Sequence, residues 1–175
     1  MDSIQRGRRR ELVICNIMGF TLFELIIVIV ILSTVVLFVF PRIPFFDDFA
    51  LNSEARRTAG LIRYLDESSS AKKIYYRVWF HQERGSLEVE SSVDGFEFKK
   101  MGEPSLKGFT LKQGIVMQDI VLQQRGRIKQ GDAAVIFSPG AGAEPFNLHL
   151  EKNGRILTIS YNPFSGKVKV SDGYI

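Results

Sequence analysis

Hydrophobic and polar residues divide this chain of 175 residues into three differently patterned stretches. Residues 25 to 40 form an apolar run that contains no charged residue. Between residues 49 and 73, apolar residues recur at spacings of three and four, and from residue 74 onward short runs rich in Val, Ile, Phe and Tyr are separated by Gly, Pro, Asp and Asn. These patterns predict a lipid-embedded helix, an amphipathic helix and a series of strands.

The apolar run extends backward to Phe20, with Glu24 as the only charged residue between Phe20 and Phe40. A helix from Phe20 to Phe40 would be about 31 Å long at ~1.5 Å per residue, which matches the roughly 30 Å hydrocarbon core of a bilayer. Arginines precede the run and acidic residues follow it, so the positive-inside rule predicts a cytoplasmic N-terminus. Everything after Pro41 is then expected on the other side of the membrane.

Two common explanations of such an N-terminus are a secretory signal peptide and a plain signal anchor. A signal peptide needs a small-x-small cleavage site after its apolar region, and the stretch from Phe38 to Pro44 offers none. A plain anchor does not explain Glu24, because a carboxylate at mid-bilayer costs roughly 2.5 to 3.5 kcal/mol and somewhat less near the interface. Cleavage between Gly19 and Phe20 would create an α-amino group one helical turn from Glu24, and this cation is the natural partner, in the same subunit or the next.

The segment Gly19-Phe20-Thr21-Leu22-Phe23-Glu24, followed by the apolar run, resembles the processing site of type IV prepilins and pseudopilins. The resemblance implies that a prepilin peptidase, which is also the N-methyltransferase, cuts after Gly19 and methylates the new amine of Phe20. It implies that Glu24 contacts a neighbouring subunit's N-terminus during assembly. The expected partners are other pseudopilins or pilins, this peptidase and an inner-membrane assembly platform.

The stretch between residues 49 and 73 predicts an amphipathic helix that packs on a sheet. Asn52 or Ser53 is expected to cap its start, and the serines from Ser68 to Ser70 are expected to loosen its end. Its apolar positions are Leu51, Ala55, Ala59, Ile62 and Leu65. Predicted strands follow at 74–81, 87–91, 96–99, 115–122, 133–137, 146–151, 156–161 and 167–170.

Asp94-Gly95 and Asn153-Gly154 are preferred residues for two-residue hairpin turns, so the last third of the chain predicts an antiparallel meander. The expected fold class is α+β, with a long N-terminal transmembrane and assembly helix packed on an antiparallel β-sheet domain. We expect a leader at 1–19 that is removed, a transmembrane and assembly helix at 20–41, a linker and amphipathic helix at 42–73, and a periplasmic β-rich domain at 74–175.

This layout is similar to that of pseudopilins, and three short segments resemble the minor pseudopilin H, or FimT-like, subset. They are Phe137-Ser-Pro-Gly140, Phe146-Asn-Leu-His-Leu150 and Ser165-Gly-Lys-Val168. The similarity spans most of the chain after the predicted cleavage site. These segments consist of turn and strand residues, so they are less specific than the segment from Gly19 to Glu24.

Charge and composition do not indicate an enzyme or a nucleic-acid-binding protein. The net charge is +4, and the basic residues after residue 19 are interspersed with acidic ones instead of clustered. Cys15 is the only cysteine, which excludes an intramolecular disulfide and a site with several cysteine ligands. His81 and His149 have no ligand at metal-site spacing, and Gly140-Ala-Gly-Ala143 predicts a flexible loop instead of a phosphate cradle. We therefore expect no catalytic residues, cofactor or metal.

Aromatic residues at two places leave their role open. Phe45, Phe46 and Phe49 form either a docking patch or a packing contact between helix and domain, of which packing is the more frequent arrangement. Tyr75, Tyr76 and Trp79 lie on one predicted strand, so at least one is expected in the core while its neighbour faces outward.

The leading hypothesis is a non-catalytic minor pseudopilin of a type II secretion system, held by a single span in the inner membrane with its C-terminal domain in the periplasm. A first alternative is a minor type IV pilin in pilus biogenesis or DNA uptake, with Arg125, Arg127 and Lys129 as DNA contacts. The ordinary interpretation of these three residues is a solvated hairpin turn. A second alternative is a signal-anchored periplasmic binding domain, which predicts no cleavage after Gly19.

Overall fold

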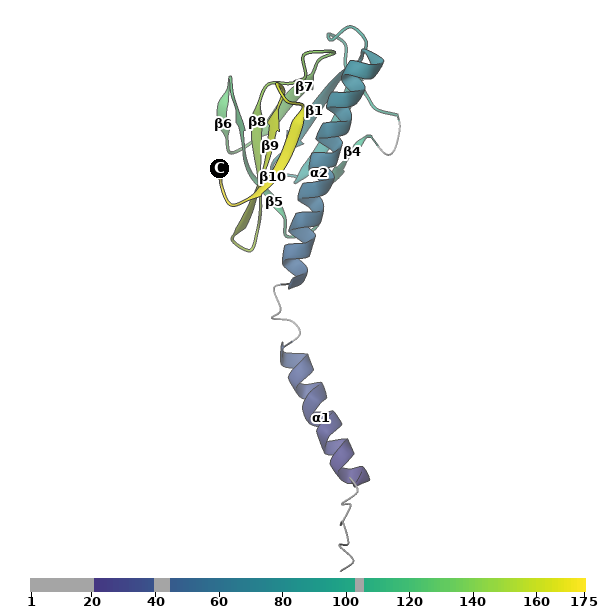
Figure 1. Ribbon diagram of the computed structural model, residues 1–175, viewed down its shortest axis with the longest axis vertical. Helices are drawn as coiled ribbons and strands as arrows, with labels where there is room; N and C mark the ends of the chain where they lie inside the picture. Colours follow the sequence, from purple (N-terminus) through teal and green to yellow (C-terminus); the bar gives the residue numbers. More distant parts are fainter. Residues whose placement is uncertain (1–20, 40–44, 103–105) are drawn as a thin grey trace, which may run out of the picture. The chain divides into compact units, whose positions relative to one another are not determined.

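The computed structural model describes residues 21–39, 45–102 and 106–175. The chain separates into two compact units, Met1–Ile43 and Pro44–Ile175. In the first unit the described element is helix α1, Leu22–Val39. The second unit contains helix α2, Phe45–Lys72, and the ten strands that the described residues form (Figure 1).

Helix α1 begins immediately after Thr21, which acts as its N-cap. The backbone N–H of Glu24 donates to Thr21 Oγ1 at 3.2 Å, and the N–H of Leu25 donates to the Thr21 carbonyl at 3.1 Å. The predicted ends of this helix, Phe20 and Phe40, lie outside the described residues. Measured by length and hydropathy together, neither of the described helices reaches what a membrane span requires.

Helix α2 confirms the predicted amphipathic helix but begins earlier than expected. Its predicted apolar positions are all buried. Because the helix begins at Phe45, Asn52 and Ser53 lie inside it and cannot be its caps. The serines do not loosen its end either, since the hydroxyl of the buried Ser69 donates to the Asp66 carbonyl at 2.8 Å and the helix continues to Lys72.

The end of α2 has the geometry of a Schellman motif. Lys73 adopts a left-handed conformation with φ of 56°, and the N–H of Ile74 donates to the Ser69 carbonyl at 3.3 Å. This bond satisfies one of the last free carbonyls of the helix and turns the chain directly into the first strand.

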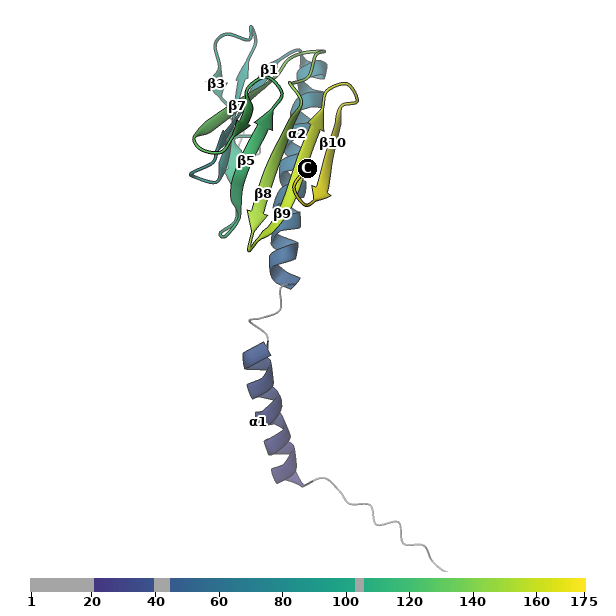
Figure 2. The same ribbon diagram turned by 90° about the vertical axis from the view of Figure 1, so that its left-hand side faces the viewer.

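All strand pairs are antiparallel, and they form two sheets of five strands. Sheet A has the order β3-β2-β1-β7, with β4 also paired to β2, and sheet B has the order β10-β9-β8-β5-β6. Figure 2 shows β8, β9 and β10 of sheet B side by side. The strands are β1 Tyr75–His81, β2 Ser86–Ser92, β3 Lys99–Lys100, β4 Gly108–Thr110, β5 Val116–Leu122, β6 Gly126–Ile128, β7 Asp132–Phe137, β8 Phe146–Lys152, β9 Arg155–Asn162 and β10 Lys167–Asp172.

Most predicted strands are confirmed, including the meander of β8, β9 and β10. Asn153 and Gly154 form the predicted two-residue turn, with φ of 51° and 82°. The third predicted strand, 96–99, is wrong except at its last residue, since pairing with β2 begins only at Lys99. Strands β4 and β6 were not predicted, because three residues are too few for a periodic pattern.

The two-residue turn predicted at Asp94-Gly95 is also wrong, and the reason is the side chain of Asp94. Its Oδ1 accepts hydrogen bonds from the Phe96 N–H at 2.9 Å, the Glu97 N–H at 3.1 Å and the Ser92 hydroxyl at 2.7 Å. These bonds lower the pKa of Asp94 to about 2, and the bond from the Phe96 N–H makes the largest contribution. The chain therefore forms a longer loop braced by this carboxylate.

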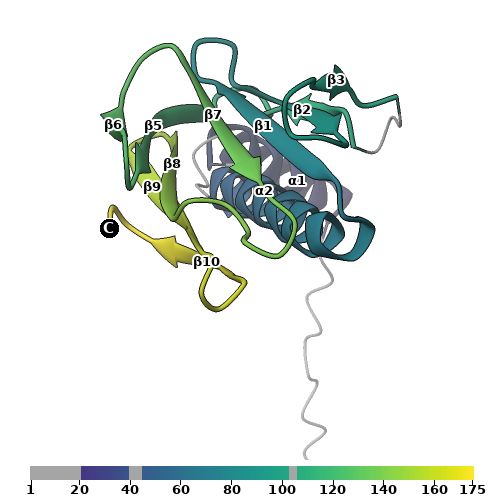
Figure 3. The ribbon, with the colours of Figure 1, turned by 90° about the horizontal axis from the view of Figure 1, so that it is seen from above.

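Helix α2 and both sheets share one hydrophobic core. The helix packs against β8, β9 and β10 of sheet B and against β1 and β7 of sheet A, and Figure 3 shows α2 below β1 with β8, β9 and β10 to its left. The Tyr161 ring packs against the rings of Phe137 and Phe146, with ring centroids 5.4 and 5.5 Å apart. The predicted α+β domain, a helix packed on antiparallel sheet, is therefore confirmed.

Gly60 offers a direct test of the helix assignment. It lies exposed in the middle of α2, and a Cβ added there would meet nothing within 4 Å. Because glycine in a helix interior is less favourable than alanine by about 0.5 to 1 kcal/mol, Gly60→Ala should raise the free energy of unfolding by that amount. Urea unfolding followed by the fluorescence of Trp79, the single tryptophan, measures the change.

Gly108→Ala provides the opposite control for this experiment. Gly108 has φ of 94°, and its added Cβ would lie 2.0 Å from the Leu87 carbonyl oxygen of the paired strand. This variant should be clearly less stable. Unchanged or lower stability of Gly60→Ala would show that the local helix at residue 60 is not as described.

Candidate assembly site

The predicted processing and assembly residues lie around the start of α1. Gly19 and Phe20 are outside the described residues, whereas Glu24 is an exposed residue in the first turn of the helix. With Thr21 as N-cap, Thr21-x-x-Glu24 has the sequence of a capping box, which is a local signal for the start of a helix. Glu24 is therefore placed to stabilise the start of α1, because an acidic side chain stabilises a helix N-terminus.

The stabilisation of a helix start by Glu24 and the cost of its charge in lipid differ in magnitude. An acidic residue in the first turn contributes about 0.3 to 1 kcal/mol, whereas a carboxylate within a bilayer costs roughly 2.5 to 3.5 kcal/mol near its centre. If α1 lies in lipid, the helix terminus alone offsets only part of that cost. A cationic partner is then still required.

Helix α1 is apolar on every side. Its leucine, isoleucine and valine side chains from Leu22 to Leu37 are exposed around the whole circumference. The hydroxyl of Thr34 donates to the Val30 carbonyl at 2.8 Å, so it needs no water. A helix without a polar face is stable only when lipid or other apolar helices surround it. Helix α1 is therefore suited to packing against lipid or other apolar helices.

Sheet B brings together a histidine and a carboxylate that the sequence did not connect. His149 of β8 lies opposite Asp119 of β5, and His149 Nδ1 is 2.6 Å from Asp119 Oδ1. Both residues are buried, with exposed fractions of 0% and 2%. The other ring nitrogen, Nε2, is 3.2 Å from the carbonyl oxygen of Ile175. With both nitrogens engaged, His149 has none free to act as a general base.

The segment 173–175 covers this pair on the outer face of sheet B. Tyr174 stacks on the His149 ring with centroids 3.8 Å apart and donates its hydroxyl to Asp119 Oδ2 at 3.0 Å. Burial and this hydrogen bond raise the pKa of Tyr174. The Thr158 hydroxyl donates to the Gly173 carbonyl at 2.6 Å. The cluster fastens the segment to the sheet and gives His149 a structural role.

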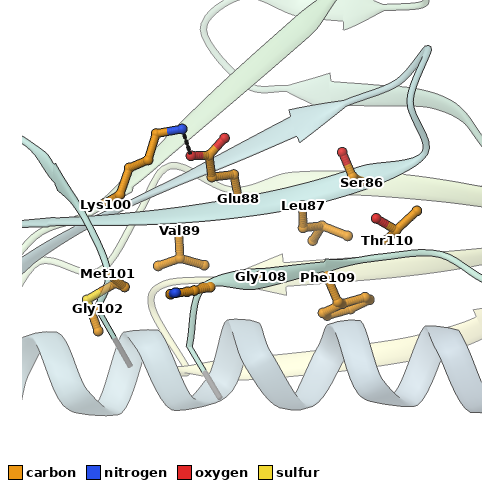
Figure 4. A pocket seen from close by; sticks show the side chains of 11 residues that line it. Ser86, Leu87, Glu88, Val89, Lys100, Met101, Gly102, Gly108, Phe109 and Thr110 are labelled. Carbon is orange, nitrogen blue, oxygen red and sulfur yellow. Dashed lines mark ion pairs between the residues drawn. The ribbon is translucent and has the colours of Figure 1, made fainter. Parts of the chain in front are cut away.

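His81, on sheet A, is also bounded by carboxylates. Its Nδ1 is 2.9 Å from Asp132, and its Nε2 is 3.5 Å from Glu88. Lys100 is 2.6 Å from Glu88 beside a hollow of about 460 Å³ between β2, β3 and β4 (Figure 4). The hydrogen bond from Lys100 is the main reason that the pKa of Glu88 is lowered. Across the described residues no group of three metal-binding side chains occurs.

The loop Gly140–Ala143 is held in place, so the prediction of a flexible loop is wrong in that respect. The Gly140 N–H donates to the Ser70 hydroxyl of α2, and the Ala143 N–H donates to the Tyr161 hydroxyl of β9, each at 3.3 Å. Tyr161 in turn donates to Asp66 at 2.7 Å, and burial is the main cause of its raised pKa. The loop therefore fastens α2 to both sheets.

The arginines proposed as DNA contacts are engaged within the protein. Arg125 donates to the Ala134 carbonyl at 2.5 Å and lies 3.6 Å from Glu144. Arg127 is 3.8 Å from Asp119 and lies over the Tyr174 ring. These contacts favour the ordinary interpretation of the β5–β6 hairpin as a structural turn.

The structure decides the role of some of the aromatic residues whose role the sequence left open. Tyr76 is buried in the core while Tyr75 and Trp79 lie on the other face of β1, as the alternation predicted. Phe49 is 75% exposed, so the packing interpretation is wrong for it. The side chains of Phe45 and Phe46 lie outside the described ones.

Comparison with known proteins identifies the fold. No family model matches the chain, and no curated protein matches it. Two solved structures of the minor pseudopilin EpsH from the type II secretion system of Vibrio cholerae are similar to it. One is 16% identical with a TM-score of 0.59, covering 73% of this chain, and the other is 14% identical with a TM-score of 0.56, covering 70%. Each match covers 97% of the solved chain, and together they show a pseudopilin-like fold.

Proposed function

We propose, from this pseudopilin-like fold, that the chain is a non-catalytic minor pseudopilin that assembles into the periplasmic pseudopilus of a type II secretion system. The observation that carries the proposal is the similarity to the minor pseudopilin EpsH over 97% of that solved chain. Helix α1 supports it independently, because a helix that is apolar on all sides needs neighbouring helices or lipid. Its partners are other pseudopilins and an inner-membrane assembly platform.

In this proposal the apolar run from Phe20 to Phe40 anchors the protein in the inner membrane. The run contains the described helix α1 and is longer than it. The arginines before residue 19 keep the N-terminus in the cytoplasm, and the domain that contains α2 and both sheets lies in the periplasm. The protein crosses the membrane once.

Processing prepares the same helix for assembly. A prepilin peptidase removes residues 1–19 and methylates the amine of Phe20, which then lies one helical turn from Glu24. Glu24 pairs with the methylated amine of a neighbouring subunit, and this pair offsets the cost of a carboxylate at membrane depth. The apolar side chains of α1 then pack against helices of other subunits.

The first measurement is the intact mass and the N-terminal peptide of the chain expressed with its cognate prepilin peptidase. We expect loss of residues 1–19 and a first residue Phe20 that carries one methyl group. Gly19→Val is the matched control, because a branched side chain at the cleavage residue blocks close approach to the backbone. A wild-type chain that keeps residues 1–19 would favour the signal-anchored binding domain instead.

A further inference from the structure

The hairpin of β9 and β10 has an exposed tip that the fold does not need. Phe164 in this turn is 95% exposed. The turn is closed without its side chain: the Phe164 N–H donates to Asn162 Oδ1 at 3.0 Å, and the Gly166 N–H donates to the Pro163 carbonyl at 3.4 Å. The phenyl ring of Phe164 therefore contributes nothing to the core and is available for a contact outside the domain.

A basic hollow of about 550 Å³ lies beside this turn, between the hairpin and α2. Its cations are Arg63 of α2 and Lys167 and Lys169 of β10, and no carboxylate lines it. Some cations elsewhere in the domain form ion pairs, as Arg77 does with Glu90. Among the described residues, by contrast, none of these three cations forms an ion pair.

A side-chain hydrogen bond near the hollow, formed by the residue between the lining residues Ser160 and Asn162, joins the hairpin to α2. Tyr161, at the end of β9, donates its hydroxyl to Asp66 of α2 at 2.7 Å, which joins the hairpin to the helix. This bond engages Oδ1 of Asp66, and among the described residues no ion pair joins Asp66 to the three cations. The backbone of the hairpin is therefore fixed on α2 before a ligand binds.

We propose that the β9–β10 hairpin and its basic hollow dock an acidic segment of a neighbouring subunit, with an apolar side chain of that segment against Phe164. The proposal rests on the proposed function in one respect, which is that the docked segment belongs to another subunit of the same pseudopilus. Exposed aromatic and arginine side chains are the residues that dominate protein interfaces, and unpaired cations select carboxylates.

The spacing of the cations suits an extended segment. Lys167 and Lys169 are two residues apart on one strand, so they point to the same side about 7 Å from each other. Two carboxylates at alternate positions of an extended chain have the same separation. A nucleic acid is less well matched, because single-strand binding uses a longer basic groove with successive stacked bases, and here there is one ring.

The test is photo-crosslinking of the full chain in cells that also contain its partner subunits. Phe164→p-benzoylphenylalanine is the probe. Phe96→p-benzoylphenylalanine is the matched control, since Phe96 is 88% exposed on a loop braced in the same way by Asp94. We expect residue 164, and not residue 96, to crosslink to a subunit peptide with at least two Asp or Glu residues, identified by mass spectrometry.

Charge variants of the hollow make the test specific. Lys167→Glu with Lys169→Glu should lower the yield at residue 164 about tenfold, whereas Lys167→Arg with Lys169→Arg should retain it. Equal crosslinking from residues 96 and 164 would overturn the proposal. So would a crosslinked peptide without acidic residues, or a product that nuclease removes.

A third probe separates this proposal from the proposed function. Leu32→p-benzoylphenylalanine reports packing of α1 against other subunits, because Leu32 is exposed on that helix. Crosslinks at residue 32 without any at residue 164 would overturn the hairpin interface and leave the assembly role intact. No crosslink at either position would overturn both.

Discussion

Glu24→Gln is expected to lower incorporation of the protein into pseudopili at least about tenfold while leaving membrane insertion unchanged. Glutamine keeps the size of the side chain and the capping-box pattern with Thr21, but it removes the charge. If Glu24 acts by pairing with a neighbouring amine, the loss of that pair exceeds about 1.4 kcal/mol, which corresponds to the tenfold effect. Recovery of the protein in sheared filament fractions, relative to the membrane fraction, measures it.

Thr21→Ala is the matched control for Glu24→Gln. It removes the hydroxyl that accepts the Glu24 N–H but keeps the carboxylate. We expect a small effect on helix stability, typical of a lost cap, and nearly normal incorporation. If instead Thr21→Ala fails to assemble and Glu24→Gln assembles normally, the role of Glu24 is helix capping, and the assembly role is wrong.

Asp119→Ala is expected to lower the free energy of unfolding by about 3 to 5 kcal/mol, the usual cost of removing one partner of a buried pair. Asp119 Oδ1 lies against His149 and its Oδ2 accepts the Tyr174 hydroxyl, so the change leaves two polar groups without a partner beneath the segment 173–175. A domain of this size is stable by only about 5 to 15 kcal/mol, so the effect is large. Urea unfolding followed by Trp79 fluorescence measures it.

Two variants test whether the buried position of Asp119 is the cause. Asp119→Asn keeps one acceptor oxygen and should lose less stability than Asp119→Ala. Asp172→Ala removes an exposed carboxylate that pairs with Arg155 at 2.9 Å and should change little. A loss below about 1 kcal/mol for Asp119→Ala would mean that the cluster does not fasten the segment.

Much of the fold was predictable because its signals are local. The spacing of Leu51, Ala55 and Ile62 indicates the buried face of α2, and Asn153-Gly154 suits only a tight hairpin turn. Such patterns depend on helix or strand geometry within a few residues. They are readable without knowing what lies across the core.

Local signals also misled where a side chain bonds to nearby backbone. The dipeptide Asp94-Gly95 suggests a tight turn, but the three hydrogen bonds to Asp94 favour a longer loop. The serines after Glu67 suggest fraying, yet the Ser69 hydroxyl bonds to the preceding turn and is buried there. In both cases the residue type suggests a local structure, but the sequence does not show which backbone group its side chain bonds to.

The clusters on the two sheets could not be predicted because their members are distant in sequence. His149 and Asp119 meet only when β5 pairs with β8, and His81 meets Asp132 only when β1 pairs with β7. A sequence alone indicates partners only at short, characteristic spacings, and neither of these pairs has one. The basic hollow was missed for the same reason, since Arg63 and Lys167 are brought together by packing of α2 on β10.

The two sheets are interleaved along the chain, which has a consequence for folding during synthesis. Strand β7 belongs to sheet A although its neighbours in sequence, β6 and β8, belong to sheet B. As the ribosome elongates the chain, β1 and β2 emerge early, but one edge of β1 stays unpaired until Phe137 has been made. By then β5 and β6 of the other sheet are already present. The nascent domain therefore carries an open edge of β1 until β7 has been made, and sheet B, which needs β8, β9 and β10, is completed last.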